Sequence, residues 1–428
     1  MRLLLVTYYY PPSGGPGVQR MLKLSKYLST LGVSVTVLTV RPETAAYPML
    51  DPSLSRDIHE NVVLLRTFSW DPYGIFAMLQ GKKKADSIEV GLRSDAGASW
   101  VQRLGRWIRG NIFLPDARVG WVPFAFARAR REHRKEPFDV VLTSGPPHSA
   151  HLVGRLLARF GRIPWVADFR DPWVDIDFKH MLPKSAVASR LDAWLERGVV
   201  TRCDALVTVS HQWATDFQTR YGGDLPMAVI HNGFDPADFP RVTAPSVYPF
   251  TIEYFGGINR DRHPGALLAA MQRLRTEDRP SVVFTGPVDG HLVEEVTRLG
   301  LSSEVTYVAY IPHEEAVRGM CRSSILLLLI NKSENNGGIL PAKIFEYAAS
   351  GRPILGIGPT DGDAARFFRE TGCGEMFDYE DVDGIEAYLH RSRAQIPAGA
   401  SEEALEPYTR TFQAEQFLAI LRKIVEQP

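Results

Sequence analysis

A short apolar strand that runs through a glycine turn into a helix opens the chain, and this feature constrains the fold most strongly. Residues 2–7 form an apolar run typical of a strand buried on both faces. Residues 11–17 then contain Gly15 and Gly17 and almost no side chains. Backbone N–H groups in such a turn, together with the positive end of the helix dipole, hold phosphate. The start of the chain therefore predicts a site for a phosphorylated ligand.

The same segment excludes NAD as that ligand. The dinucleotide fingerprint needs a third glycine, and Arg20 stands at its position after Gly15 and Gly17. An acidic residue should also follow the second strand to hold the ribose. Here Val40 leads into Arg41. We therefore expect phosphate binding without a nicotinamide cofactor.

Length and cysteine usage narrow the class of protein further. A chain of 428 residues suits two domains of about 200 residues each. The three cysteines lie far apart without C-x-x-C spacing, which indicates a reducing compartment and argues against structural zinc. No run approaches the ~20 apolar residues that a membrane span needs. We expect a cytoplasmic protein.

The alternation of strands and helices continues and then restarts, which predicts two similar domains. Ligands of such sheets lie beyond the carboxyl ends of the strands. We therefore expect an α/β protein with two doubly wound Rossmann-like domains that face a cleft. The expected boundaries are a first domain at 1–235, a proline-rich linker at 236–249, a second domain at 250–412 and a C-terminal helix at 413–428 that packs back on the first domain.

The second domain contains a glycine loop followed by a buried helix. Gly337 and Gly338 predict an open loop, Pro341 fits the first helical turn, and Gly351 fits the stop. Glu346 stands among apolar residues on this helix, where an unpaired carboxylate is costly. We interpret Glu346 as the acceptor of hydrogen bonds from two ribose hydroxyls. The alternative is a solvated helix residue.

Four segments in the same order resemble glycosyltransferase family 4, whose two-Rossmann architecture is called GT-B. The resemblance implies retaining transfer from a nucleotide sugar without a required metal, with UDP as the expected nucleotide. It also implies that the glycine turn holds the donor diphosphate and that Glu346 holds the ribose. The matching segments are 13–20, 208–210, 230–235 and 345–354.

One departure from the family concerns the donor sugar. The family has a glutamate eight residues before the position of Glu346, and this chain has Gly338 there. The backbone amides of Gly338, Ile339 and Leu340 are the expected replacement. The Leu-Pro-Ala-Lys segment that ends at Lys343 resembles a subgroup that acts in surface polysaccharide synthesis, so we expect Lys343 in the donor site.

A second departure concerns the cations that neutralise the donor diphosphate. The family places an Arg and a Lys after the first strand of the second domain. This chain offers Arg260 and Arg262 after Gly257, at an unusual spacing. Either arginine can stabilise the leaving group. The alternative is that both are exposed surface arginines.

The expected acceptor side lies in the first domain. Arg170 stands where family members often have a histidine, and Asp171 follows it. Asp171 can orient or deprotonate an acceptor hydroxyl, and Arg170 can hold a phosphate. The alternative is an Asp171 that caps a turn and pairs with Arg170. His148 and His151 follow the end of another strand, and either can touch the acceptor, although a histidine at a helix start without a ligand is equally consistent.

Residues 100–135 combine many arginines with aromatic residues. The N-terminal residues 1–240 hold 30 Lys and Arg against 23 Asp and Glu, out of 49 of each in the chain. Arginine with aromatics at helical spacing suits an anionic membrane surface. We expect peripheral attachment to the inner face of the plasma membrane and no nucleic-acid partner, since no recognised nucleic-acid module is present. The alternative is that the aromatics pack on their own domain.

The sequence thus predicts an enzyme that moves a sugar from a nucleotide sugar to a lipid-linked or oligosaccharide acceptor. Two rival functions stay open. A UDP-sugar epimerase has the same fold and needs no acceptor. A non-catalytic nucleotide-sugar-binding partner of another transferase is compatible with the glycine at position 338. Fold alone does not separate these functions, because function depends on the site.

Overall fold

The computed structural model describes residues 1–70, 100–176, 183–222, 225–239 and 250–426, which form two compact units. Unit 1 contains Met1–His231 and Gln413–Pro428, and unit 2 contains Asn232–Phe412. The first unit ends four residues before the predicted boundary at 235. Pro236–Asp238, in the predicted linker, form a short 3-10 helix of unit 2, and residues 240–249 lie outside the described part.

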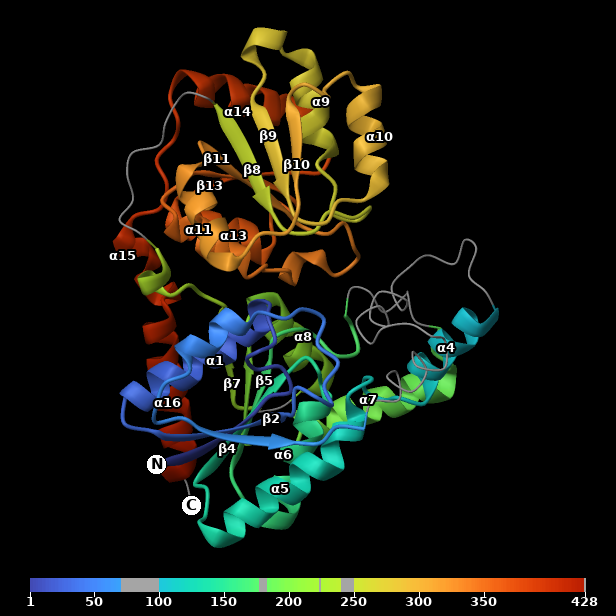
Figure 1. Ribbon diagram of the computed structural model, residues 1–428, viewed down its shortest axis with the longest axis vertical. Coiled ribbons are helices and arrows are strands. Elements are labelled where there is room, and N and C mark those ends of the chain that lie inside the picture. Colours follow the sequence, from blue (N-terminus) through green and yellow to red (C-terminus); the bar gives the residue numbers. More distant parts are fainter. Residues whose placement is uncertain (71–99, 177–182, 223–224, 240–249, 427–428) are drawn as a thin grey trace. The chain divides into compact units, whose positions relative to one another are not determined.

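Within its described residues, unit 1 is built on a seven-stranded parallel sheet in the order β3-β2-β1-β4-β5-β6-β7 (Figure 1). The strands are β1 (Arg2–Val6), β2 (Ser34–Val40), β3 (Val63–Thr67), β4 (Val140–Gly145), β5 (Trp165–Phe169), β6 (Ala205–Thr208) and β7 (Met227–Val229). The helices are α1 (Pro16–Thr30), α4 (Trp100–Asn111), α5 (Val122–Lys135), α6 (Ser149–Gly161), α7 (Ala186–Val200), α8 (His211–Tyr221) and most of α16 (Arg410–Glu426). The reversal of strand order beside β1 is the doubly wound pattern that we predicted.

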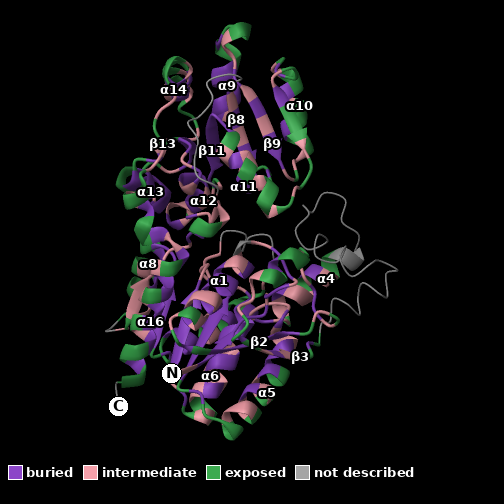
Figure 2. Cartoon of the chain, turned by 60° about the vertical axis from the view of Figure 1, so that its left-hand side comes forward, coloured by how far each residue is buried: buried purple, intermediate pink, exposed green. Residues whose placement is uncertain are grey.

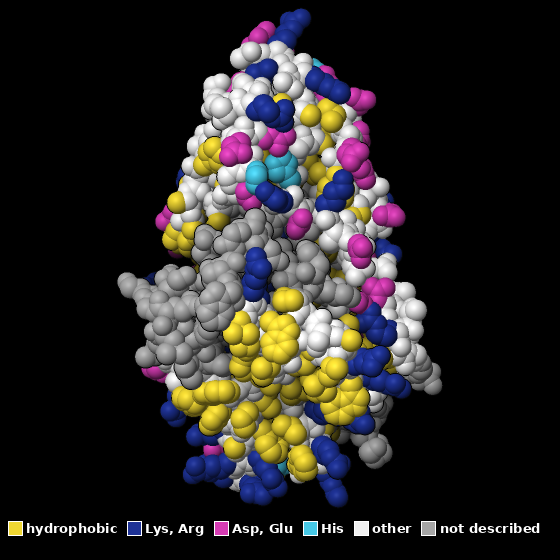
Figure 3. Space-filling model, turned by 90° about the vertical axis from the view of Figure 1, so that its right-hand side faces the viewer, with side chains coloured by type: hydrophobic (Ala, Val, Ile, Leu, Met, Phe, Trp, Pro, Cys, Tyr) yellow, Lys and Arg dark blue, Asp and Glu magenta, His cyan; other side chains and the backbone are white. Residues whose placement is uncertain are grey.

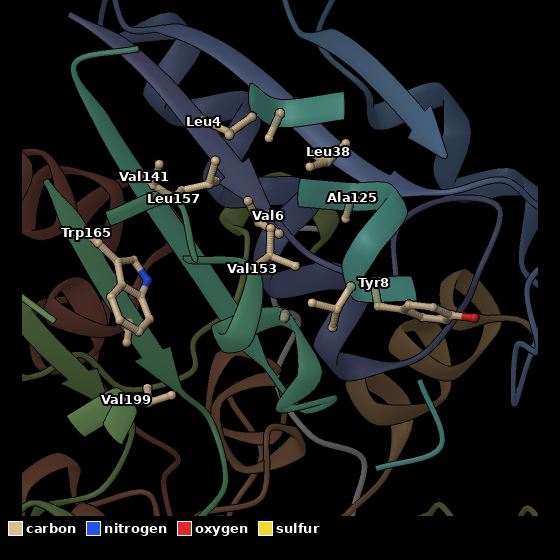
Figure 4. Packing of buried hydrophobic residues seen from close by; sticks show 14 of the residues in the cluster. Leu4, Val6, Tyr8, Leu38, Ala125, Val141, Val153, Leu157, Trp165 and Val199 are labelled. Atoms are coloured by element: carbon tan, nitrogen blue, oxygen red, sulfur yellow. The ribbon is translucent and has the colours of Figure 1, made fainter. Parts of the chain in front are cut away.

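Side chains alternate between the two faces of this sheet and build two apolar layers. Leu4 and Val6 of β1 pack with helices α5 and α6 on one face, as Figure 4 shows. Leu3 and Leu5 pack on the other face with α1 and α16. The central strands are buried on both faces, which explains why they read as mostly apolar runs in the sequence (Figure 2).

Unit 2 repeats this design with a six-stranded parallel sheet in its described part, in the order β10-β9-β8-β11-β12-β13. The strands are β8 (Thr251–Phe255), β9 (Ser281–Thr285), β10 (Val305–Val308), β11 (Ile325–Leu329), β12 (Ile354–Ile357) and β13 (Gly374–Phe377). The helices are α9 (Gly265–Arg273), α10 (Gly290–Arg298), α11 (His313–Arg322), α12 (Lys343–Ala349), α13 (Asp363–Thr371), α14 (Val382–Ala394) and α15 (Glu402–Leu405). The predicted pair of doubly wound Rossmann-like domains is confirmed.

Two local expectations in unit 2 were wrong, and a third was confirmed. Gly337 and Gly338 belong to a 3-10 turn, Asn336–Gly338, and do not form an open loop. Pro341 precedes the helix, because α12 begins at Lys343. Gly351 does follow the helix in the left-handed region, with φ of 70°. The helix that carries Glu346 is therefore shorter than the pattern indicated, at 7 residues.

Candidate functional site

The glycine turn of unit 1 brings the first turn of α1 against Arg170, the residue that follows β5. Gly15 caps α1 with φ of 101°, and its carbonyl accepts hydrogen bonds from the amides of Val18 and Gln19. A Cβ atom at Gly17 would overlap the guanidinium of Arg170. A side chain at position 17 would therefore have to displace the Arg170 guanidinium, which lies directly against the helix start.

The position of Arg170 is electrostatically unusual. Its guanidinium donates to the Pro146 carbonyl and lies at the positive end of the α1 dipole. Burial lowers the pKa of Arg170, while the nearby carboxylates of Asp168 and Asp171 oppose that shift. Two sources of positive charge thus face one another, and a bound anion would stabilise both.

A buried ion pair that the sequence did not predict fixes the position of α1. Arg20 is 2% exposed and Asp168 is fully buried, and Arg20 Nη2 lies 2.8 Å from Asp168 Oδ1. Arg20 also donates to the carbonyls of Ile230 and His231, at 3.0 and 2.6 Å. Ser144 donates to the same carboxylate at 2.7 Å. Arg20 therefore has a structural reason to replace the third glycine of the dinucleotide pattern.

Two histidines lie beside Arg170 in an aromatic cluster. His148 stacks on Trp173 with a centroid distance of 5.0 Å, and His151 stacks on Phe169 at 4.3 Å. Burial lowers the pKa of His151 to about 3 and lowers that of His148 well below its usual value. Both imidazoles are therefore neutral near pH 7. His148, a predicted site residue, can act there only as a neutral group.

Asp171 and Asp175 are placed differently. Asp171 is half-buried next to Arg170, so the structure brings together the predicted residues Asp171, Arg170 and His148. Asp175 forms an ion pair with Arg220 of α8. Within the part of the chain that the structure describes, no group of three or more His, Cys, Asp or Glu side chains is arranged to hold a metal ion.

In unit 2, Glu346 lies on α12 with its carboxylate partly accessible. His313, the first residue of α11, contacts it, with His313 Nε2 2.9 Å from Glu346 Oε1. The two side chains are 27% and 24% exposed. This contact holds the carboxylate in place and leaves room for a ligand. The sequence did not indicate His313, because nothing in its spacing relates the start of α11 to α12.

Lys343 lies one helical turn before Glu346 and reaches the end of β8. Its Nζ donates to the Phe255 carbonyl at 2.6 Å and lies 4.1 Å from the ring centre of Tyr254. Gly256 has φ of 138°, and a Cβ atom there would overlap Lys343 Nζ. Burial lowers the pKa of Lys343. Lys343 is thus a desolvated cation that an anionic ligand would stabilise.

The structure separates the two arginines that the sequence treated together. Arg262 donates to Asn331 Oδ1 at 2.9 Å and to the Gly257 carbonyl at 3.4 Å. It is close enough to Lys343 to lower the pKa of that amine. Arg260 is exposed and contacts His291 of α10 instead. Arg262 therefore shares a region with Lys343 and Gly257, whereas Arg260 faces another element.

The segment before α12 offers fewer backbone donors than predicted. The amide of Ile339 already donates to the Asn336 carbonyl at 3.0 Å. Leu340 is buried in the apolar cluster of α12 and α13, and Gly338 is buried as well. A backbone contact with a donor sugar is thereby reduced to the amides of Gly338 and Leu340.

Comparison with known families gives one match. A family model described as Glycosyltransferase Family 4 matches residues 17–238, which is just over half of the chain. A comparison with curated protein sequences found no match. Among the described residues, no helix has both the length and the apolar character needed to cross a membrane.

Several solved structures share the fold. Anabaena HepE in complex with UDP and glucose is 15% identical, with a TM-score of 0.63, and the match covers 99% of this chain and 100% of HepE. Sucrose-phosphate synthase from Thermosynechococcus elongatus is 14% identical, with a TM-score of 0.65 and coverage of 99% and 98%. The lipopolysaccharide outer core galactosyltransferase WaaB is 12% identical, with a TM-score of 0.60 and coverage of 99% and 100%. At these identities the likeness establishes the fold, which is GT-B.

Proposed function

This chain belongs to glycosyltransferase family 4 and is a glycosyltransferase, and from that premise we propose that it transfers a sugar from a UDP-sugar to a hydroxyl acceptor with retention of configuration. In this proposal unit 2 binds the donor and unit 1 binds the acceptor. The observation that carries it is the grouping of a partly accessible carboxylate, Glu346, with the cations Lys343 and Arg262. A carboxylate next to cations suits a ribose next to a diphosphate.

The nucleotide part of the donor is assigned to Glu346. Its carboxylate would accept hydrogen bonds from the two ribose hydroxyls, while His313 holds it in orientation at 2.9 Å. UDP is the proposed nucleotide, and the complexes of HepE with UDP and with UDP-glucose support this choice. The sugar would contact the backbone near Gly338, where the family has a glutamate.

Positive charge on the leaving diphosphate would come from Lys343 and Arg262. Lys343 is desolvated, so a diphosphate would raise its lowered pKa again and gain a strong ion pair. Arg262, which Asn331 orients, would supply a second cation. Arg260 would contribute only at longer range. In this proposal these side chains neutralise the leaving group without a required metal ion.

In unit 1, Arg170 and the start of α1 would hold a phosphate of the donor or of the acceptor. Asp171 would orient the acceptor hydroxyl. The acceptor oxygen would form its bond to the anomeric carbon on the face from which the phosphate leaves. As the bond between that carbon and the phosphate oxygen breaks, the hydroxyl proton would pass to the departing phosphate, and UDP would be released. This step explains retention without a dedicated base.

The proposed acceptor is a lipid-linked or glycan hydroxyl used in surface polysaccharide or glycolipid synthesis. The resemblance of the Leu-Pro-Ala-Lys segment at Lys343 to the polysaccharide subgroup supports this assignment. A cytoplasmic enzyme on the inner face of the plasma membrane fits a lipid-linked acceptor. The predicted membrane contact through residues 100–135 cannot involve the whole segment. Arg106, Arg118 and Trp121 of this segment are buried.

The first test is calorimetric titration with UDP, GDP and NAD in the presence of EDTA. We expect UDP to bind and Glu346→Gln to raise its dissociation constant by about 10–100-fold, since a hydrogen bond to a charged group contributes about 1.5–3 kcal/mol. Glu375→Gln, which removes a carboxylate paired with Arg391 elsewhere in unit 2, is the matched control and should bind as wild type. Binding of NAD in place of UDP or GDP would refute the proposal.

Turnover distinguishes the rival activities. Incubation with UDP-sugars and a hydroxyl acceptor should give a glycoside of retained configuration. Conversion of a UDP-sugar without any acceptor would indicate an epimerase. An inverted product would refute the same-face step and leave the donor site intact.

A further inference from the structure

Helices α4 and α7 of unit 1, together with Ile112 directly after α4, carry large apolar side chains that face solvent. Their exposed fractions reach 74% for Val187, 60% for Ile112 and 59% for Trp194. We call this set the α4–α7 surface, and it consists of Leu104, Trp107, Ile112, Val187, Leu191 and Trp194. Figure 3 shows the face of unit 1 that carries these helices, with hydrophobic side chains gathered on it and Lys and Arg at the border. Contiguous exposed apolar surface of this kind marks an interaction site.

The apolar residues lie on one side of each helix. Val187, Leu191 and Trp194 have the i, i+4, i+7 spacing that aligns side chains along one face of α7. Leu104 and Trp107 have i, i+3 spacing on α4. Such stripes normally pack against the core, and here they are solvent-exposed instead.

Direct hydrogen bonds join the two helices at their ends. Asn111, the last residue of α4, donates from Nδ2 to the Pro183 carbonyl at 2.7 Å. Its Oδ1 accepts from the amide of Ser185, the residue that caps α7, also at 2.7 Å. The end of α4 and the start of α7 are therefore fixed to each other.

The acidic side chains of α7 are buried, whereas its arginines are exposed. Both of its acidic residues are buried: Asp192 accepts from Trp173 and Lys184, and Glu196 accepts from the Val174 amide and from Arg220. Its exposed charges are cations, Arg190 and Arg197. The exposed face of α7 is therefore apolar and positive.

The neighbouring helices extend this positive border. Helix α4 contains arginines and no acidic residue, and α6 likewise. Arg155 of α6 lies over the ring of Trp194, with 5.1 Å to its centre. Across the described residues of α4, α6 and α7, no carboxylate is exposed.

We propose that the α4–α7 surface binds the headgroup region of an anionic lipid bilayer, with Trp107, Trp194 and the aliphatic residues inserted and the arginines on the lipid phosphates. Apolar residues bordered by cations without exposed acids fit a surface that is both apolar and negatively charged. A protein partner would need an equally uniform negative rim around an apolar centre. The bilayer supplies both properties over an extended plane.

This surface differs from the one that the sequence predicted. Of the aromatics in residues 100–135, Trp121 is fully buried, and Phe126 packs near Phe160 of α6 with a centroid distance of 6.1 Å. The alternative reading, that the aromatics pack on their own domain, holds for these residues. The proposed apolar contact keeps the α4 part of the predicted segment, with Trp107, and adds α7, which the sequence had not assigned to the membrane.

The inference rests on the proposed function only in that a lipid-linked acceptor would lie in the same bilayer. The lipid contact itself involves none of the residues assigned to nucleotide binding. Vesicle binding and UDP binding can therefore fail separately, and each failure identifies the proposal that is wrong.

The test is cosedimentation of the full chain with vesicles of phosphatidylcholine, alone or mixed with phosphatidylglycerol. We expect binding to the anionic vesicles only, weakened by salt. Trp194→Glu should weaken binding by about tenfold or more, because it replaces an inserted apolar side chain with a negative charge. The double variant Arg190→Glu with Arg197→Glu should also weaken binding by about tenfold or more, because each cation near such a membrane contributes about 1 kcal/mol. Unchanged UDP affinity and thermal midpoint would show that the variants are folded.

Matched controls come from α10 of unit 2. Val293→Glu replaces an exposed apolar residue, and Arg298→Glu replaces an exposed arginine, and both should bind vesicles as wild type. Three results would overturn the proposal: no vesicle binding by wild type, equal loss in the controls, or a wild-type dimer that Trp194→Glu converts to a monomer. The last result would assign the surface to a second copy of the chain.

Discussion

The two units use charged side chains in opposite ways at the regions assigned to ligands. In unit 1, the Arg20–Asp168 pair is 2% and 0% exposed, and it is hydrogen-bonded to the Ser144 hydroxyl and to the carbonyls of Ile230 and His231. In unit 2, His313 and Glu346 are 27% and 24% exposed. The buried pair fixes the backbone to which other site residues are attached. The accessible pair holds a carboxylate that a ligand can still reach.

This difference has an energetic basis. Burying two charges carries a desolvation cost that is offset only when every donor and acceptor is satisfied, so removal of one partner is severe. A partly exposed pair loses little when one partner is removed, because water replaces it. We therefore expect mutations of the Arg20–Asp168 pair to change stability and mutations of the His313–Glu346 pair to change ligand affinity.

The largest effect is expected from Arg20→Met. This change leaves Asp168 buried without its cation, and it should lower the free energy of unfolding by about 3–5 kcal/mol. Chemical denaturation at neutral pH measures it. Lys23→Met on the same helix is the control, because its partner Asp57 is 36% exposed and the loss should be smaller. Equal losses would remove the distinction between buried and accessible pairs.

A somewhat smaller effect on the free energy of unfolding is expected from the protonation of His151 as the pH falls. Burial, with a contribution from Arg170, lowers the pKa of His151 from its ordinary value of 6.5 to about 3. The unfolded chain therefore takes up a proton at this site before the folded chain does, and stability is lost as pH falls below 6.5. At about 1.4 kcal/mol for each pKa unit, the loss is about 2 kcal/mol over the first one and a half pH units.

His151→Gln tests this directly. The variant should lose less stability than wild type over the same pH interval, with the remaining slope coming in part from His148, whose pKa is also lowered by burial. Denaturation curves at a series of pH values give the slope. His390→Gln, at an exposed position on α14, should keep the wild-type slope. Identical slopes for His151→Gln and wild type would contradict the prediction.

The smallest effect is expected from His313→Ala. Loss of the contact at 2.9 Å should raise the dissociation constant for UDP by about two- to fivefold, as expected for a pair worth less than about 1 kcal/mol. His313→Gln can still donate to Glu346 and should recover most of the affinity, and His390→Ala should have no effect. Calorimetric titration of the three variants with UDP measures these dissociation constants. Tighter binding of UDP by His313→Ala would mean that His313 occupies the place of the ribose.

Most of the fold could be predicted because the central strands are buried on both faces. Runs such as those around Leu4 and Leu327 contain little but apolar residues, and each became a strand of a parallel sheet. The exception was β13, Gly374–Phe377, which has one glutamate and one glycine in four residues and lies at the edge of its sheet. An edge strand needs fewer apolar residues, so its sequence signal is weaker.

The candidate site could be predicted only where one continuous segment carries it. Lys343 and Glu346 share a short helix, so the sequence grouped them. Arg20, Asp168 and His313 act through contacts between elements far apart in the chain, which spacing does not reveal. The α7 stripe shows a further limit, because the spacing of Val187, Leu191 and Trp194 is the same for a buried face and for an exposed one.

Gly17 lies so close to Arg170 that a residue change at one of these positions affects the other. A side chain at position 17 would displace the guanidinium, so its effect on ligand binding would resemble loss of the arginine itself. Relatives with a larger residue at the first position should therefore have a smaller one at the second. Engineering of the proposed phosphate site has to redesign both positions together.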